Sequence, residues 1–249
     1  DVLARLIKKT LYIGVFAFII GNYNNLAPVI YNSFAGLGIE AGGGTINASQ
    51  LLQPGKIAEV GIDAGKPILT AISGMMGFTS VFATLVQIII LLVACRLVII
   101  SFFVMAIQLF VSLIEFKLTT LAGFVLVPFG LFGRTAFLAE RVLGNVVSSG
   151  IKILVLAVII GIGSTIFNQF TSGFNNPPTI SDALTLILAA LSLLGLTIFG
   201  PGIANGLIAG GPQLGAGAAI GTGLAAAGIG AAGIAATAGG LAAAGGAIA

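Results

Sequence analysis

The sequence predicts an all-α integral membrane protein with about four transmembrane helices, and its composition and its apolar runs both support this fold class. Of the 249 residues, 58% are hydrophobic and 7% are charged, whereas an average soluble domain contains about 25% charged residues. Several stretches approach the length of about 20 apolar residues that crosses a hydrocarbon core. They are continuous, as in VQIIILLVACRLVII at residues 86–100, which excludes a transmembrane barrel, whose strands alternate apolar and polar residues.

Residues 1–33 are expected to form the first membrane helix, and its start is basic. Arg5, Lys8 and Lys9 precede an apolar run that begins at Leu11. Lys and Arg flank membrane spans mainly on the cytoplasmic side, so we expect these three residues to anchor the helix at that face. A signal peptide also has a basic lead, but here the polar GNYNNLAP follows instead of a small-residue cleavage site.

Residues 34–77 differ from the runs around them, because they are polar, rich in glycine and carry charges of both signs. Turn residues and mixed charge are typical of an extramembrane loop, here with one short helix. Because the basic start of the chain is expected in the cytoplasm, this loop is expected in the periplasm.

Residues 78–200 are expected to form the membrane core, which opens with a long helix. Residues 81–114 hold no turn signal and a single charge, Arg96, so they predict a helix of about 50 Å, longer than a hydrocarbon core of about 30 Å. The expected bilayer part is residues 97–114, between Arg96 and Glu115. Either the preceding residues project as an apolar surface that needs a protein neighbour, or the helix tilts and Arg96 snorkels or pairs.

A short segment at residues 118–149 is expected to be re-entrant or interfacial. Its apolar part is interrupted by Gly123, Pro128, Gly130 and Gly133. The basic residues that flank this part are Lys117 on one side and Arg134, Arg141 and Lys152 on the other. A full crossing would place the two sides on opposite faces, against the positive-inside bias. Irregular backbone at membrane depth must be buried in protein or line water, so the four interrupting residues are candidates for subunit assembly or channel lining.

Two further spans and a glycine- and alanine-rich region complete the chain. The spans are predicted at residues 150–170 and 183–199, and no charge follows Asp182. In residues 201–249, three pairs of glycines are spaced by four: Gly206 and Gly210, Gly211 and Gly215, Gly217 and Gly221. This spacing lets membrane helices approach closely. A flexible low-complexity tail would have the same composition, and close helix packing is the preferred interpretation.

The residues predict no enzyme, no metal site and no cofactor site. Histidine is absent and Cys95 is the single cysteine, which excludes an intrachain disulfide and an ordinary Cys/His metal site. Fragments of a phosphate loop (GIDAGKP), a dinucleotide fingerprint (GIGAAG) and a Ser-x-x-Lys motif (SGIK) each lack their companion features. A bound phospholipid is the one small ligand considered: Arg134 and Arg141 could bind lipid phosphates or a neighbouring carboxylate, with plain interfacial anchoring preferred.

Two stretches in the middle of the chain are distinctive, LIEFKLTTLAGFVLVPFG at residues 113–130 and AERVLGNVVSSGIK at residues 139–152. Together with LARLIKKT near the start and TIFGPGIA near residue 200, they closely resemble the TrbL family of conjugative-transfer proteins. These are polytopic inner-membrane subunits of type IV secretion systems. Family members usually carry one more membrane segment before the basic stretch, so the resemblance implies a chain that starts late.

The resemblance implies a non-catalytic subunit of an inner-membrane platform or channel, which supports pilus assembly and transfer of DNA–protein substrates. It also implies partners: a homo-oligomeric ring, stalk or minor pilin, pilin, ATPases and membrane lipids, with the transferred DNA–protein complex touching the chain only indirectly or transiently. A secondary transporter or ion channel is the alternative, because broken helices and intramembrane charge also mark those proteins. Against it, the sequence shows no repeated half and few charges for a relay.

Overall fold

The computed structural model describes residues 2–43, 47–75, 81–172 and 179–209. Its elements, in chain order, are α1 (Val2–Ala41), α2 (Ala48–Leu51), α3 (Pro54–Met75), α4 (Val81–Leu126), the 3-10 helix η1 (Val127–Leu131), α5 (Ala136–Ser172) and α6 (Ile180–Ala209). Every element in these ranges is a helix, so the prediction of an all-α fold is confirmed.

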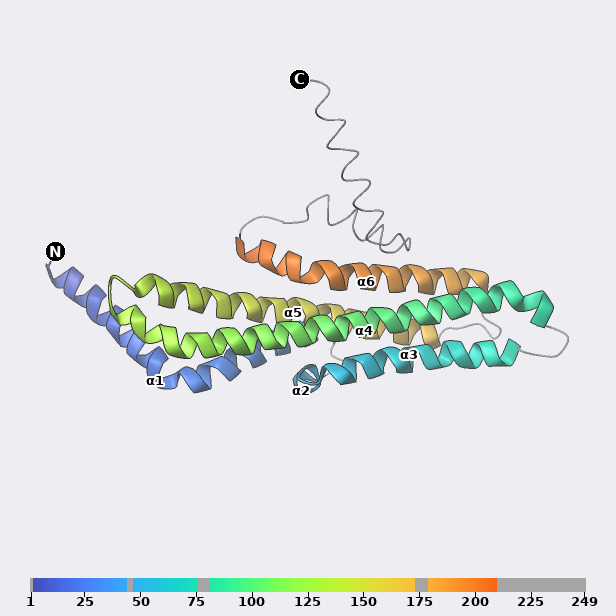
Figure 1. Ribbon diagram of the computed structural model, residues 1–249, viewed down its shortest axis with the longest axis horizontal. Coiled ribbons are helices and arrows are strands. Elements are labelled where there is room, and N and C mark those ends of the chain that lie inside the picture. Colours follow the sequence, from blue (N-terminus) through green and yellow to red (C-terminus); the bar gives the residue numbers. More distant parts are fainter. Residues whose placement is uncertain (1, 44–46, 76–80, 173–178, 210–249) are drawn as a thin grey trace, which may run out of the picture.

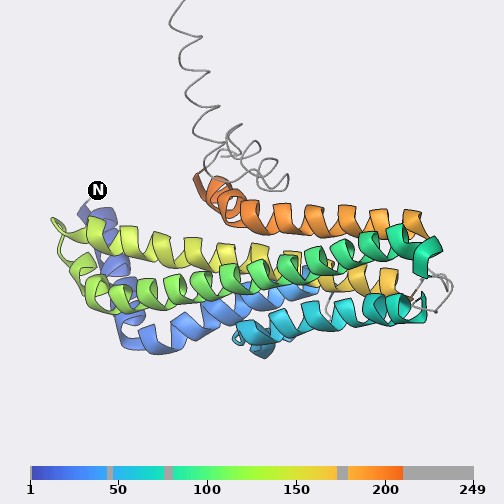
Figure 2. The ribbon, with the colours of Figure 1, turned by 45° about the vertical axis from the view of Figure 1, so that its right-hand side comes forward.

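α4 and α5 form an antiparallel helical hairpin on which the other long helices pack (Figure 1). α1 and α3 lie on one side of this hairpin, one after the other along its length, and α6 lies on the opposite side (Figures 1 and 2). α1 covers the half of the hairpin near its turn, whereas α3 covers the other half. The two ends of the hairpin therefore have different neighbours.

Three of the described helical segments are long and apolar enough to cross a membrane: Thr84–Leu131, Ala136–Gln169 and Ile180–Ile208. The expected number was about four, and α1, expected as the first span, is not in this set. The basic start and the asparagines of α1 lower its mean hydropathy. α1 also changes direction near its middle (Figure 1), where Pro28 lies inside the helix and removes a backbone hydrogen bond.

α4 is longer than the expected helix, because it continues beyond residue 114 to Leu126. Its 46 residues extend for about 70 Å. The chain turns only after α4, at η1, where Pro128 stands in the first turn, and α5 begins at Ala136. Residues 118–149 are thus the end of α4, a tight turn and the start of α5. The structure shows the tip of a helical hairpin there, and its re-entrant or interfacial position in the bilayer stays a prediction.

Residues 34–77 also differ from expectation, because they are largely helical. α1 continues to Ala41 and ends where Gly43 adopts a φ of +106°, a left-handed conformation that favours glycine at helix ends. α3 then follows as a 22-residue helix. It packs against α4 through an apolar face whose buried residues are Ile57, Gly61, Ala64, Gly65, Ile68, Ile72 and Met75. Glycine and charge in this region conceal the helical spacing of those residues.

One cross-section of the molecule joins α3, α4, α5 and α6. The backbone of Gly61 in α3 lies against the side chain of Phe102 in α4. The Phe102 ring meets that of Phe167 in α5 edge to face, with 5.6 Å between ring centroids. Next to Phe102, the Ser101 hydroxyl donates a 2.8 Å hydrogen bond to the carbonyl oxygen of Ala190 in α6. These contacts place the five residues at one level along the bundle.

Candidate assembly site at the tip of the helical hairpin

The hairpin tip is defined as residues 116–151. Two aromatic side chains of α1 pack over two glycines of this tip and hold it against α1. The Tyr23 side chain lies over Gly123 and the Phe16 ring lies over Gly130, so a Cβ atom at either glycine would overlap a ring. Both aromatic side chains are buried. The two glycines therefore serve a contact within the chain, in which α1 approaches the hairpin closely.

Two hydrogen bonds fix this contact. The Tyr23 hydroxyl donates to the carbonyl oxygen of Thr120 at 2.9 Å. The Tyr12 hydroxyl donates to the carbonyl oxygen of Gly130 at 3.0 Å, which lies in η1 and has no α-helical partner to satisfy it. Sequence reasoning identified the glycines but missed the α1 aromatic residues, because residues about 100 positions apart share no local pattern.

The other two interrupting residues, Pro128 and Gly133, form the turn itself. Pro128 is among the first residues of η1, where its missing N–H costs no hydrogen bond. Gly133 follows η1 and has open space around its Cα. The hydroxyl of Thr135 closes the turn by donating to the carbonyl oxygen of Phe129 at 3.0 Å. The four predicted residues thus divide into two contact positions and two turn positions.

An ion pair joins the two helices at the base of the hairpin tip. The Lys152 Nζ atom in α5 lies 2.6 Å from the Glu115 Oε1 atom in α4. The Lys152 side chain is 14% exposed and that of Glu115 is 43% exposed. One turn further toward the tip, the hydroxyls of Thr119 and Ser149 are 3.3 Å apart. Lys152, expected as an interfacial anchor, and Glu115, expected as an intramembrane or interfacial charge, are therefore partners.

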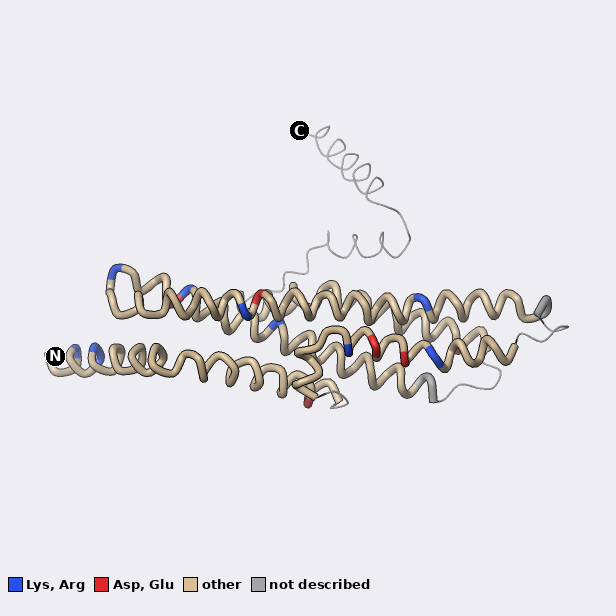
Figure 3. Tube along the Cα trace, turned by 60° about the horizontal axis from the view of Figure 1, so that its bottom comes forward, with Lys and Arg blue, Asp and Glu red and all other residues tan. Residues whose placement is uncertain are grey.

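The remaining basic candidates are all exposed: Arg5, Lys8, Lys9, Lys117, Arg134 and Arg141. Figure 3 shows basic residues both near the N-terminus and at the turn of the hairpin, which lie at the same end of the molecule. This placement is what anchoring at one membrane face requires, and the anchoring itself stays a prediction. Arg96 is also exposed, on the half of α4 that α3 covers.

The hairpin tip exposes a large apolar surface. Its exposed residues are Leu118, Leu121, Phe124, Val125, Phe129, Leu131, Phe132 and Phe137, with exposed fractions between 41% and 67%. Apolar surface on this scale marks contact with lipid or with another protein. The tip therefore requires a neighbour that the chain alone does not supply.

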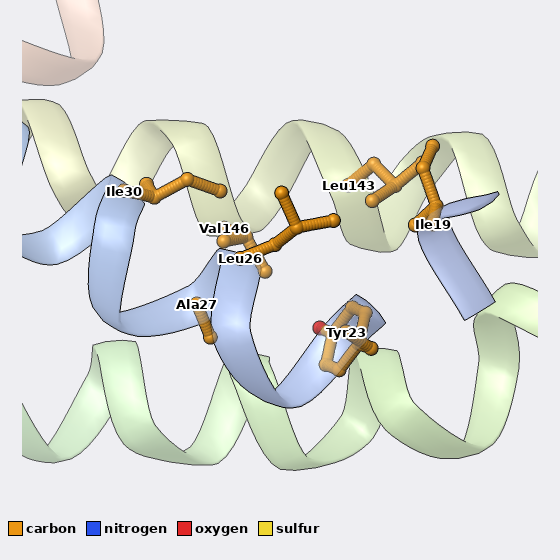
Figure 4. A pocket seen from close by; sticks show the side chains of 7 residues that line it. All are labelled: Ile19, Tyr23, Leu26, Ala27, Ile30, Leu143 and Val146. Carbon is orange, nitrogen blue, oxygen red and sulfur yellow. The ribbon is translucent and has the colours of Figure 1, made fainter. Parts of the chain in front are cut away.

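A small apolar cavity lies between α1 and α5 beside the tip (Figure 4). Its volume is about 130 Å³, and it is lined by Ile19, Tyr23, Leu26, Ala27, Ile30, Leu143 and Val146. The lining side chains reach it from successive turns of α1, between Ile19 and Ile30, and from α5. An apolar side chain or a lipid acyl chain matches this lining, whereas a charged ligand does not.

Small residues bring the second half of α1 close to α5. Gly38 lies against Ala157 and the backbone of Leu154, and Gly42 packs against the backbone of Gly161. Both pairs, Gly38 with Gly42 and Ala157 with Gly161, are spaced by four, the spacing that permits close helix approach. Sequence reasoning sought this motif only near the end of the chain. There, Gly206 is buried in α6, and the other five predicted glycines lie outside the described residues.

In the described ranges, no group of three or more His, Cys, Asp or Glu side chains could hold a metal ion. A model of the family described as TrbL/VirB6 plasmid conjugal transfer protein matches residues 1–200, which include the hairpin tip. The family comprises non-enzymatic, inner-membrane components of type IV secretion systems. No solved structure matches the chain.

Two curated relatives carry the same family name. "Probable conjugal transfer protein TrbL" of Sinorhizobium fredii (strain NBRC 101917 / NGR234) is 29% identical over 213 residues, covering 83% of this chain and 50% of the relative. "Conjugal transfer protein TrbL" of Rhizobium radiobacter is 28% identical over 226 residues, covering 89% and 51%. The chain spans about half the length of these curated relatives. With a match over residues 1–200, the resemblance is confirmed, and the chain belongs to the TrbL/VirB6 family of plasmid conjugal transfer proteins.

Proposed function

We propose that this chain acts in an inner-membrane platform or channel of a conjugative type IV secretion system, where it supports pilus assembly and the transfer of DNA–protein substrates. The observation that carries the proposal is the family match over residues 1–200, which contains α1 to α5 and most of α6. The chain contributes position and contact surface. Energy for transfer comes from separate ATPases.

The proposed partners are further copies of the chain in a ring, together with the stalk or minor pilin, pilin, ATPases and membrane lipids. The exposed apolar residues of the hairpin tip support the ring, because they need a neighbour in any aqueous compartment. The cavity between α1 and α5 takes an apolar side chain of a neighbouring copy or an acyl chain of a bound phospholipid. DNA–protein complexes touch the chain only indirectly or transiently.

A mating assay tests the role in transfer. Deleting the gene in a donor strain is expected to abolish both conjugation and pili, and the full-length gene is expected to restore them. Phe132→Gln, at an exposed position of the hairpin tip, should restore transfer poorly. Leu52→Gln, at an exposed apolar position after α2, is the matched control and should restore it fully. Transfer that persists after deletion contradicts the proposal, and equal effects of the two variants contradict the role of the tip.

Native mass spectrometry of the detergent-solubilised protein tests the ring. Several copies with bound lipid support the assembly role. A monomer whose thermal stability rises with a small solute would contradict that role and favour the alternative, a secondary transporter or ion channel.

A further inference from the structure

α3 carries a continuous polar stripe on the face that points away from α4. The stripe consists of Lys56, Glu59, Asp63, Lys66, Thr70 and Ser73, all exposed. Their spacing alternates between three and four residues, which places them on one side of a helix. The buried apolar residues of α3 occupy the opposite side, against α4. α3 therefore has one face adapted to protein and one adapted to water.

Two ion pairs organise the charges of this stripe. The Lys56 Nζ atom lies 2.8 Å from Glu59 Oε2, and the Lys66 Nζ atom lies 2.6 Å from Asp63 Oδ1. All four side chains remain between 53% and 68% exposed. Within each pair the two charges are opposite and cancel, yet no other described part of the protein covers the side chains. The four charged side chains thus require solvent or polar neighbours, whereas the Thr70 and Ser73 hydroxyls donate to backbone carbonyl oxygens of α3 itself.

The position of the stripe relative to the bilayer follows from the cross-section described above. Residues 97–114 of α4, 153–172 of α5 and 183–209 of α6 contain no charged residue. Each stretch approaches or exceeds the length of about 20 residues that crosses a hydrocarbon core. All three pass through the level at which Phe102, Phe167 and Ala190 meet. This level therefore lies within the segment best suited to the bilayer core, toward the end at which Arg96 stands.

The first half of the polar stripe, from Lys56 to Asp63, lies at or near that same level, whereas the stripe from Lys66 onward lies beyond the contact of Gly65 with Cys95. Gly61 packs on Phe102, and Glu59 and Asp63 are each two residues from Gly61, within about 3 Å along the helix axis. Nearer the other end of α3, the Cys95 thiol of α4 donates to the carbonyl oxygen of Gly65 at 3.8 Å. Charged side chains at bilayer depth face a bundle interior or a water-filled cavity, because lipid cannot solvate them.

α6, on the other side of the hairpin, has the opposite character. It exposes Leu184, Leu188, Leu196 and Ile198, and it lies across the α4–α5 hairpin from α3 (Figures 1 and 2). One side of the molecule is therefore apolar at this level, as lipid contact requires, and the other side is charged. A protomer with this asymmetry fits a ring whose outer wall is α6 and whose inner wall is α3.

We propose that the polar stripe of α3 borders a water-filled space at the depth of the bilayer core, enclosed by further copies of this chain. The enclosure rests on the ring assembly proposed above, whereas the contact of the stripe with water rests on the packing of α3 alone. One protomer cannot enclose such a space, since its stripe occupies an outer surface of the bundle.

Site-directed spin labels in the full chain, reconstituted in lipid bilayers, test the contact with water. In a Cys95→Ala background, Asp63→Cys places a label on the stripe and Leu188→Cys places the matched control on α6 within one turn of Ala190. The label at position 63 should collide with a water-soluble nickel chelate, and the label at position 188 with lipid-soluble oxygen. Glu59→Cys repeats the test at the same level with the Asp63–Lys66 pair intact, in case the loss of Asp63 impairs folding.

Two results overturn the assignment of the stripe. If labels at positions 63 and 59 collide mainly with oxygen, the stripe contacts lipid. If the label at position 188 collides with the nickel chelate as strongly as they do, the whole level lies outside the bilayer. Neither result depends on conjugation, because both are measured on reconstituted protein.

Distances between copies test the enclosure. Pulsed dipolar spectroscopy of singly labelled protein should give a shorter distance between copies at position 63 than at position 188, because the stripe faces the ring axis. A longer distance at position 63, or no dipolar coupling at either position, overturns the enclosure. The mating assay separates the two proposals. If the Asp63→Cys variant still supports plasmid transfer while its spin label contacts lipid, this inference is wrong and the proposed function stands. Loss of the proposed function appears separately, in the mating assay.

Discussion

Tyr23 and Tyr31 lie about two turns apart on α1 and are both buried, but only one of their hydroxyl groups has a hydrogen-bond partner in the described part of the chain. The Tyr23 hydroxyl donates to Thr120 in α4 at 2.9 Å. The Tyr31 ring packs 5.8 Å from the Phe116 ring, and its hydroxyl has no hydrogen-bond partner among the described atoms. A buried polar group that forms a hydrogen bond stabilises a fold, whereas an unpaired one opposes it.

The two tyrosines therefore give a matched pair of variants. Tyr23→Phe should lower the free energy of unfolding by about 1 kcal/mol, because it removes one hydrogen bond and leaves the Thr120 carbonyl oxygen without that donor. Tyr31→Phe should cause no loss, because no bond is broken. Thermal unfolding in detergent micelles measures both. A loss of stability in Tyr31→Phe equal to that in Tyr23→Phe would contradict the assigned roles.

The Glu115–Lys152 pair makes a second prediction about single residues. Because Lys152 is mostly buried, Glu115→Gln should destabilise the protein by leaving its ammonium group without a countercharge. A double-mutant cycle with Lys152→Gln should show a coupling energy of about 1 kcal/mol. Lys117→Gln, two residues from Glu115 and exposed, serves as the control and should change stability by less than about 0.5 kcal/mol. Additive effects of Glu115→Gln and Lys152→Gln would show that the pair has no energetic role.

The residues of the tip could be located from the sequence, but their partners could not. Gly123 and Gly130 stand out because they interrupt an apolar run. An interruption is compatible with a turn, a re-entrant loop or a close approach by another helix, and local pattern does not separate these three. The partner of Gly123 is Tyr23, a hundred positions earlier. Only the bend of α1 and the packing of the hairpin bring the two together.

Packing between α1 and α5 depends on glycines that leave no room for a side chain. A Cβ atom at Gly38 would lie 2.6 Å from the Leu154 carbonyl oxygen and 2.7 Å from the Ala157 Cβ atom. Gly36, two residues away on the same helix, has no atom within 4 Å of where a Cβ atom would lie. The two positions share a helix and differ in contact, so they isolate the effect of packing from that of helix propensity.

Gly38→Ala should destabilise the protein by about 1–3 kcal/mol, because the backbones of α1 and α5 must separate to admit the methyl group. Gly36→Ala should instead stabilise it by up to about 1 kcal/mol, because alanine favours a helix and the site is open. Chemical denaturation in mixed micelles compares them. The close approach of α1 to α5 would be refuted by equal stability changes in the two variants.

Among the elements, the sequence was most informative where apolar residues are continuous. The regions of α4, α5 and α6 were predicted as membrane helices for this reason, and all three contain segments able to span a bilayer. α3 was missed as a long helix, because glycine and charge in residues 54–75 are as typical of a loop as of a helix. Its helical spacing has meaning only once α4 supplies the apolar surface on which it packs.

At the scale of the whole molecule, the hairpin is longer than a bilayer is thick. α4 extends for about 70 Å, more than twice a hydrocarbon core of about 30 Å. If the core surrounds the uncharged residues 97–114, the hairpin tip projects on the side of Glu115 and Lys152. Its exposed phenylalanines and leucines then lie beyond the core, where copies of the chain or other subunits must cover them.

We expect the tip in the cytoplasm. The N-terminus and the turn of the hairpin lie at one end of the molecule, and both carry basic residues (Figure 3), which favours the cytoplasmic face. α4 is then expected to reach the periplasm toward its N-terminal end, and the end of α5 and the start of α6 lie at that same end of the bundle (Figure 1). We therefore predict that the turn does not cross the bilayer a second time.

Cysteine labelling in a Cys95→Ala background tests this topology. A membrane-impermeant thiol reagent added to spheroplasts should label Asn176→Cys and leave Arg134→Cys unlabelled. After permeabilisation it should label both, because Arg134 is exposed at the turn of the hairpin. Labelling of Arg134→Cys from the periplasmic side would place the tip across the bilayer and reverse the charge argument. In that case Lys152 and Glu115 would form their ion pair inside the hydrocarbon core. Removing the Glu115 carboxylate would then lower the free energy of unfolding by more than it would at the interface. If Arg134→Cys is protected from the reagent in spheroplasts, Glu115→Gln should therefore show the moderate loss of stability expected at the interface and not the larger loss expected in the hydrocarbon core.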